Sequence, residues 1–157
     1  MENKDRCIEV PVVRVKLYED FKIKVSSKKA YGIEEAGKIF YELIGSSTVE
    51  KSALLCLDND YNILNASIVN IGTIDNVEIS ISEIFRIALL SNAKRIILAH
   101  NHPSNNMQPS NYDIKITKNI GNLSRLFKME LIDSVIVGND LNKIYSIRNN
   151  LENLKES

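Results

Sequence analysis

The stretch Ile96-Ile-Leu-Ala-His-Asn-His-Pro-Ser-Asn-Asn-Met-Gln-Pro-Ser-Asn-Tyr-Asp113 determines how the rest of this chain is organised. Its apolar start, Ile96 to Ala99, is typical of a buried strand. The strand runs into His100 and His102, which are the only two histidines of the chain. Because residues i and i+2 of a strand point to the same face, both imidazoles are predicted to converge just beyond the strand end.

The second half of the stretch turns and begins a helix. Pro103 has no N–H and ends the strand, and the asparagines and proline between positions 105 and 109 favour turns. Ser110 is a good helix N-cap, which places Asp113 in the first turn. A loop that folds back in this way brings Asp113 beside the two imidazoles. Two neutral imidazoles and one carboxylate, with a fourth position open, form a ligand set of catalytic zinc.

A simpler interpretation is a pair of loop histidines, a capping serine and an aspartate that favours the helix dipole. Five matched positions (His, His, Pro, Ser, Asp) occur together by chance roughly once in a few million starting points, at about one in twenty for each. The metal-site interpretation is therefore preferred.

The pattern H-x-H-P-x6-S-x2-D resembles the motif of the JAMM (MPN-plus, JAB) metalloproteases, and His-Asn-His-Pro-Ser is similar to its RadC branch. The resemblance covers about residues 33–140. It implies the JAMM fold, a cytidine-deaminase-like α/β/α sandwich with a mixed central sheet and flanking helices. It also implies one Zn²⁺ per chain, held by His100, His102 and Asp113. Full-length RadC proteins carry a helix-hairpin-helix segment before this domain. Here we expect a single domain over residues 1–157, with its core at about 30–148 and no such segment.

The remaining sequence predicts strands and helices that fit this class. Helices are expected at Ile33–Ile44, with Gly45 as its cap, at Ser80–Leu90 and at Asn111–Phe127. Strands are expected at Ala53–Leu57, Ile63–Ile71 (closed by Gly72-Thr73), Glu130–Val137 and Lys143–Ile147, and a polar tail compatible with a helix at Asn149–Ser157. Pro11–Leu17 alternates apolar and basic residues and predicts a half-exposed strand, which Lys22–Ser27 extends or pairs. We interpret its lysines as protection of a solvated edge rather than as a binding patch.

A catalytic zinc still needs a carboxylate that takes the proton of its bound water. Spacing alone does not choose among 20 acidic residues. The resemblance implies Glu50, because Glu50 to Asp58 fits the RadC frame Glu-x-x-x-x-Leu-x-Leu-(Asp/Asn). The alternative is an exposed glutamate in a linker. Ser110 has two readings, an N-cap and, from the family, a donor to the oxyanion of the tetrahedral intermediate.

The chain departs from the family pattern at several positions. Asp133 resembles the aspartate of a RadC Asp-His pair, but Ser134 replaces the histidine. Residues 79–83 replace the family's His-Pro-Arg-Glu. These departures leave the metal ligands unchanged, and any substrate contact or support of the ligands that the family's Arg and His provide is not expected to carry over. Asn105 stands where the family has glycine and still tolerates a left-handed backbone. Asn101 points to the face opposite the histidines, and a structural role is expected.

Composition limits the function classes. No run of about 18 apolar residues predicts a membrane span, and the first residues lack the pattern of a signal peptide. Cys7 and Cys56 lack Cys-x-x-Cys spacing, and Cys56 is expected to be a buried thiol, so a reducing cytoplasm is predicted. With 20 basic and 20 acidic residues the formal charge is zero, which argues against a general nucleic-acid-binding surface.

Three functions follow as hypotheses. The first is a JAMM-type zinc hydrolase that cleaves a peptide, isopeptide or related amide, acting on an unidentified protein or peptide as a monomer or a homodimer paired through the basic N-terminal edge. The second is a DNA-repair or mobile-element accessory protein with a structural metal. The third is a zinc deaminase, which needs His/Cys-x-Glu and Pro-Cys-x-x-Cys motifs. The sequence contains neither.

Overall fold

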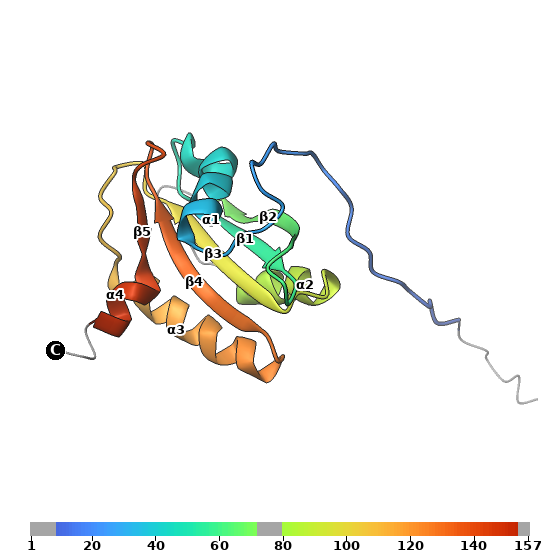
Figure 1. Cartoon of the computed structure of the whole chain (residues 1–157). Coiled ribbons are helices and arrows are strands. Elements are labelled where there is room, and N and C mark those ends of the chain that lie inside the picture. The colour runs from blue at the N-terminus through green and yellow to red at the C-terminus, as the bar shows by residue number, and fades with distance from the viewer. Residues whose placement is uncertain (1–8, 72–79, 154–157) are drawn as a thin grey trace, which may run out of the picture.

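A computed structural model describes residues 9–71 and 80–153 of the chain (Figure 1). The elements in chain order are α1 (Ile33–Phe40), the π-helical turn η1 (Tyr41–Gly45), β1 (Lys51–Leu57), β2 (Ile63–Ile71), α2 (Ile81–Leu90), β3 (Arg95–Asn101), α3 (Asn111–Leu126), β4 (Glu130–Val137), β5 (Ile144–Ser146) and α4 (Ile147–Asn153).

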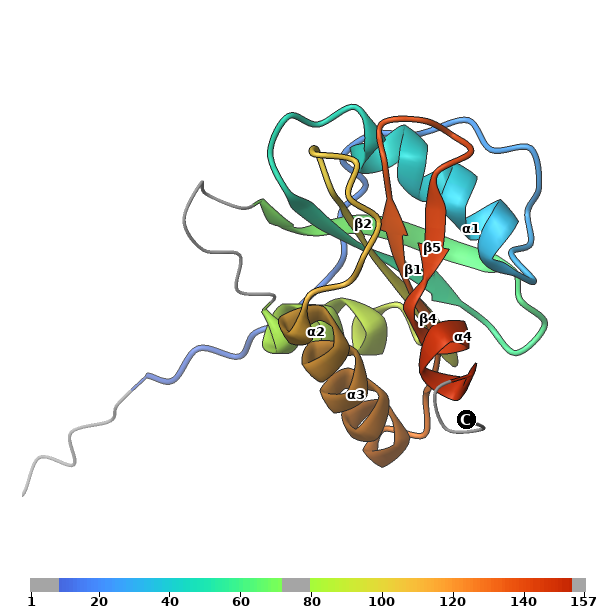
Figure 2. The same ribbon diagram turned by 90° about the vertical axis from the view of Figure 1, so that its left-hand side faces the viewer.

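The five strands form one sheet in the order β2-β1-β3-β4-β5. β3 and β4 are parallel, and the other neighbours are antiparallel. In Figures 1 and 2, α1 covers one face of the sheet while α2 and α3 cover the other. This confirms the predicted mixed sheet with flanking helices, an α/β/α sandwich.

Each face of the sheet has its own apolar core, because side chains alternate along the central strands. On the α1 face, Leu55 and Ile97 pack against Phe40. On the α2/α3 face, Leu54 and Leu98 are buried together with residues of both helices. β1 and β3 are therefore buried on both faces, as their continuous apolar runs predicted. This fixes their register, since a slip by one residue would exchange the two faces.

The first helical segment consists of an α-helix followed by a π-helical turn. It was predicted from Ile33 to Ile44 and continues as a π-helical turn through Gly45. Gly45 does not cap the helix in a left-handed conformation, since no described glycine has a positive φ angle. Its role is steric: a Cβ there would lie 2.4 Å from the Tyr41 ring.

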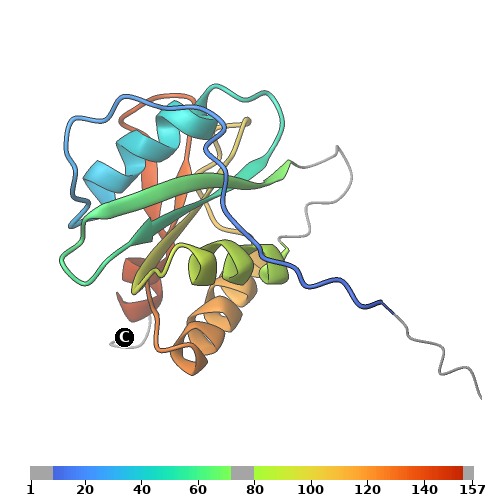
Figure 3. The same cartoon turned by 90° about the vertical axis from the view of Figure 1, so that its right-hand side faces the viewer.

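The predicted strand at Pro11–Leu17, and its extension at Lys22–Ser27, are wrong. Residues 9–28 form no helix or strand. The first part of this segment runs away from the folded domain (Figures 1 and 3), while Ile23 packs against the core on the α1 face. A strand needs a neighbouring backbone to bond with, and among the described residues no strand pairs with Pro11–Leu17 or Lys22–Ser27. Pairing begins with an isolated bridge between Lys29 and Asn62, just before β2, beside which the Ile63 N–H donates to the Lys28 carbonyl.

The C-terminal part differs from its prediction only in detail. β5 is shorter than the predicted Lys143–Ile147, and the tail is helical from Ile147 as α4. Asp133 is buried and accepts hydrogen bonds from the Ser146 hydroxyl and the Arg148 N–H, so it caps α4. The predictions for Gly72-Thr73, Cys7 and residues 154–157 lie outside the described residues.

Candidate metal centre

The end of β3, the start of α3 and the residue before β1 meet at one edge of the sheet. β1 and β3 are antiparallel, and Ser52 lies directly opposite His100. Continuing this register by two residues puts Glu50 opposite His102. All four side chains then belong to the face that α2 and α3 cover. The topology thus brings a glutamate about fifty positions away to the histidine motif.

The structure brings together the three predicted metal ligands. The Nε2 atoms of His100 and His102 are 3.0 Å apart. His100 Nε2 lies 3.4 Å from Asp113 Oδ1, and His102 Nε2 lies 4.0 Å from Asp113 Oδ2. One ligand atom from each of these residues falls within 4.8 Å of the others. His100 and Asp113 are buried and His102 is half-buried, so water reaches the cluster from one side.

The ring of His102 is oriented by the loop that follows it. Its Nδ1 donates a hydrogen bond to the carbonyl oxygen of Asn106, and its backbone N–H donates to the carbonyl of Val137 at the end of β4. A carbonyl only accepts, so Nδ1 carries a proton, which leaves Nε2 as the nitrogen that can offer a lone pair to the cluster. Asn105 has a φ of 58°, the left-handed conformation that its sequence position tolerates.

Ser110 holds Asp113 in place through a capping box at the start of α3. The Ser110 N–H and hydroxyl each donate to Asp113 Oδ2 at 2.7 Å, and the Asp113 N–H donates back to Ser110 Oγ at 3.1 Å. Burial by itself would raise the pKa of the Asp113 carboxyl. The hydrogen bonds and charge from His100, together with those from Ser110, outweigh burial and hold this pKa below its usual range. Asp113 is therefore an anion at neutral pH.

These donors fit Zn²⁺. A tetrahedral zinc with bonds of about 2.0–2.1 Å has ligand atoms about 3.3–3.4 Å apart. The two Nε2 atoms are 3.0 Å apart, and the Asp113 carboxylate lies 3.4 Å from His100 Nε2 through Oδ1 and 4.0 Å from His102 Nε2 through Oδ2, distances close to that value. Two imidazole nitrogens that converge beside one carboxylate also suit a cation in place of the hydrogen that they now share. Three protein ligands leave a fourth position for water, as in catalytic rather than structural zinc sites.

Glu50 lies beside this cluster without belonging to it. Its Oε1 is 3.9 Å from His102 Nε2, and the side chain is 44% exposed. This position suits a group that exchanges protons with metal-bound water, because it is close and still reaches solvent.

Ser52, two residues further along the chain in β1, is buried, and its hydroxyl has no hydrogen-bond partner in the described part of the chain.

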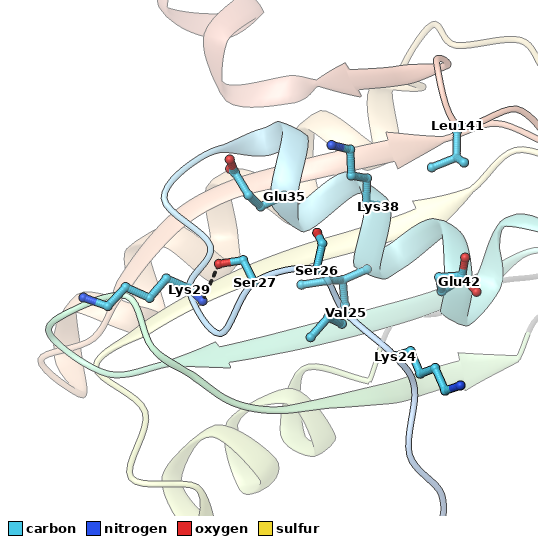
Figure 4. A pocket seen from close by; sticks show the side chains of 10 residues that line it. Lys24, Val25, Ser26, Ser27, Lys29, Glu35, Lys38, Glu42 and Leu141 are labelled. Atoms are coloured by element: carbon cyan, nitrogen blue, oxygen red, sulfur yellow. Dashed lines mark hydrogen bonds between the residues drawn. The ribbon is translucent and has the colours of Figure 1, made fainter.

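The pocket drawn in Figure 4 is separate from the metal centre. It has a volume of about 230 Å³ and lies between residues 24–29 and α1, with Glu35 and Lys38 among its lining residues. α1 packs on the face of the sheet opposite the histidines. No residue of the cluster lines this pocket, so it has no part in the chemistry considered below.

Fold and site together define an α/β domain of the JAB type with a His-His-Asp cluster that could hold a metal ion. The family model described as "RadC-like JAB domain" matches residues 31–153, and the chain belongs to this RadC-like family. It is 35% identical over 107 residues to a UPF0758 protein of Finegoldia magna, covering 68% of this chain and 48% of that protein. It is 31% identical over 129 residues to one from Clostridium acetobutylicum, covering 82% and 54%.

The chain spans about half the length of the curated relatives that it matches. Their names state no activity. Within residues 9–71 and 80–153, no helix combines the length and apolar character needed to cross a membrane.

Two residues near the site, Ser52 and Asn101, have contacts that no sequence pattern predicts. Ser52 has no motif that distinguishes it from other strand serines, and only the register of β1 against β3 places it opposite His100. Asn101 was expected to be structural. Its side chain does bind backbone, at Ser47, Val49 and Lys51, on either side of Glu50. Those contacts join residues about fifty positions apart, which no local pattern shows.

Proposed function

We propose that this protein is a zinc-dependent hydrolase of JAMM type that cleaves a peptide, isopeptide or related amide bond. The observation that carries the proposal is the convergence of His100, His102 and Asp113 with Glu50 at their open side. His100, His102 and Asp113 would hold the ion. A bound Zn²⁺ supplies a water whose pKa is near 7 and polarises the substrate carbonyl.

Glu50 acts first as general base and then as general acid. Its carboxylate accepts the proton of the attacking water and passes it to the leaving amine. The exposure of this side chain lets its carboxylate move between those two positions. Ser110 supplies a hydroxyl at the same edge. Its hydrogen now binds Asp113 Oδ2, and turning it toward the substrate oxygen would stabilise the developing negative charge.

The experiment is hydrolysis of a mixed library of peptides and isopeptide-linked peptides by zinc-loaded protein, with products identified by mass spectrometry. Glu50→Gln removes the base and leaves the three ligands, so we expect zinc content unchanged and turnover lower by about 10²- to 10⁴-fold. Equal turnover by both proteins would contradict the proposal.

The same proteins separate hydrolysis from a DNA accessory role. Zero net charge supplies no general attraction for phosphates. Salt-dependent binding of DNA fragments that Glu50→Gln leaves unchanged, together with no hydrolysis, would favour the accessory role.

We also propose that residues 9–22, the N-terminal arm, bind a second copy of this chain. The apolar side chains of the arm are 44–100% exposed, namely Val10, Val12, Val13, Val15, Leu17, Tyr18 and Phe21. β2 is an edge strand with β1 as its neighbour, so its outer side offers backbone groups to an added strand. The arm of one copy can therefore add as a strand to β2 of a second copy. When the second copy's arm binds β2 of the first in the same way, the two form a closed two-fold dimer.

The size of the arm suits such a dimer. Full burial of one large apolar side chain stabilises by about 1.5–3 kcal/mol, at about 25 cal/mol per Å² of apolar surface. These values correspond to roughly 60–120 Å² of surface removed from water per side chain. Side chains alternate along an added strand, so four of the seven share one face, namely Val13, Val15, Leu17 and Phe21. In two arms these contribute roughly 500–1,000 Å², before the surface that they cover is counted. Stable interfaces bury about 1,200–2,000 Å² in total.

A further inference from the structure

We infer that Asn101 is the residue that positions Glu50 for catalysis. This inference rests on the proposed function, since it assigns a role toward the general base of that reaction. Asn101 lies between the two histidines, and its side chain points to the opposite face of β3. It is 1% exposed, so its amide must find partners within the protein.

Those partners are the backbone groups on both sides of Glu50. The Lys51 N–H donates to Asn101 Oδ1 at 2.7 Å. Asn101 Nδ2 donates to the carbonyl oxygens of Val49 and Ser47, both at 3.2 Å. The Val49 carbonyl belongs to the peptide bond before Glu50, and the Lys51 N–H belongs to the one after it. One side-chain amide therefore holds both peptide planes that set the direction of the Glu50 side chain.

The segment that carries Glu50 needs such an anchor. Residues 46–50 lie between η1 and β1 and form neither helix nor strand. Apart from a local contact of the Ser47 hydroxyl with Val49, Asn101 supplies the side-chain hydrogen bonds that hold this segment to β3. Asparagine suits this anchoring role, because its side chain offers one acceptor and two donors in a single planar group.

The arrangement links the base to the metal ligands through three consecutive residues. His100 and His102 place their rings on one face of β3, and Asn101 fixes the Glu50 backbone from the other. A displacement of a catalytic group by about 1 Å can cost about 10²-fold in rate. Asn101 is thus a positioning residue that acts through Glu50, without contact to the metal ligands' ring atoms.

The test compares Asn101→Ala with the unmutated zinc-loaded protein. We expect one zinc per chain in both, an unchanged KM, and a kcat lower by about 10- to 100-fold. In the Glu50→Gln background the same substitution should lower kcat less than about 2-fold, because its partner is already disabled. A full additional loss in that background, or loss of zinc, would overturn the inference.

Two controls keep the result interpretable. Asn101→Ser keeps a polar group at this buried position but is too short to reach both peptide planes. It is measured in parallel, so the outcome does not depend on the alanine variant folding. Ser146→Ala removes a buried hydroxyl of β5 that binds Asp133, two strands away from β3. It should lower the melting temperature without lowering kcat, and an equal loss of kcat there would point to a general stability effect.

A readout independent of activity separates this inference from the proposed function. Hydrogen exchange of the Lys51 amide should accelerate at least about 10-fold in Asn101→Ala, while that of Leu54, inside β1, stays unchanged. Unaltered exchange at Lys51 would overturn the anchoring even in an active enzyme. An unmutated zinc-loaded protein that hydrolyses no member of the library would refute the hydrolase proposal, and with it the catalytic part of this inference.

Discussion

Glu50 and His102 face each other across the edge of the sheet, with Glu50 Oε1 3.9 Å from His102 Nε2. The antiparallel register of β1 against β3 produces this pair, because it continues the Ser52–His100 pair by two residues on each strand. A carboxylate therefore stands at the edge of the His-His-Asp cluster without replacing one of its ligands.

Removing one imidazole should abolish metal binding. His102→Ala leaves two donors, His100 and Asp113, where a catalytic zinc site needs three protein ligands. We expect about one zinc per chain in the unmutated protein and less than about 0.1 in the variant, measured by elemental analysis after dialysis against dilute zinc. Gln108→Ala, an exposed change in the same loop, should keep its zinc. Zinc retained by His102→Ala would contradict the proposed ligand set.

Ser110 should affect stability and turnover separately. Ser110→Ala removes the N-cap of α3 and a hydrogen bond to Asp113, and we expect the free energy of unfolding to fall by about 0.5–2 kcal/mol. Loss of a donor to the oxyanion should also lower kcat by about 10²- to 10³-fold. Denaturant unfolding and steady-state kinetics measure the two effects. Ser110→Thr keeps the hydroxyl, so full activity loss in that variant would argue against the donor role.

The Cys56 thiol should be unreactive in the folded protein. Burial raises the pKa of this thiol to about 11, an effect only partly offset by a hydrogen bond with Ser91. In a Cys7→Ser background, thiol reagents at pH 8 should modify Cys56 only after denaturant is added. Rapid modification of the native protein would show that the thiol is accessible.

The same raised pKa gives a stability change with a definite sign. The folded thiol keeps its proton between the unfolded pKa of about 9 and the folded value of about 11, so stability falls as pH rises through this window. The Cys56 contribution should decrease by about 1.4 kcal/mol between pH 8 and pH 10. Denaturant unfolding at the two pH values measures it, and Cys56→Ala should lack this component.

The N-terminal arm should control self-association. Val13→Lys combined with Val15→Lys places charge on the apolar side of the arm, and we expect a dimer to become a monomer by sedimentation equilibrium. Arg14→Ala and Lys16→Ala change the alternate positions and should leave the dimer intact. A monomeric unmutated protein would mean that the arm folds onto its own domain or binds another protein.

The sequence alone determined most of the elements and the His-His-Asp cluster. Apolar runs and periodicity gave β1, β3 and α3, because burial of such runs depends on local spacing that any compact fold must respect. The alternation of side chains along a strand, followed by a turn and a capping serine, brought His100, His102 and Asp113 together for the same local reason.

Only the tertiary structure decided the features that depend on contacts between residues far apart in the sequence. The register of β1 against β3 sets Glu50 beside His102, and Asn101 ties the peptide planes around Glu50 to β3. Asp133 faces α4 rather than the His-His-Asp cluster. The strand-like pattern at Pro11–Leu17 forms no strand, because a strand exists only where another backbone accepts its hydrogen bonds. Alternation of apolar and polar residues shows that the side chains favour a strand, but it does not specify which backbone the strand would pair with.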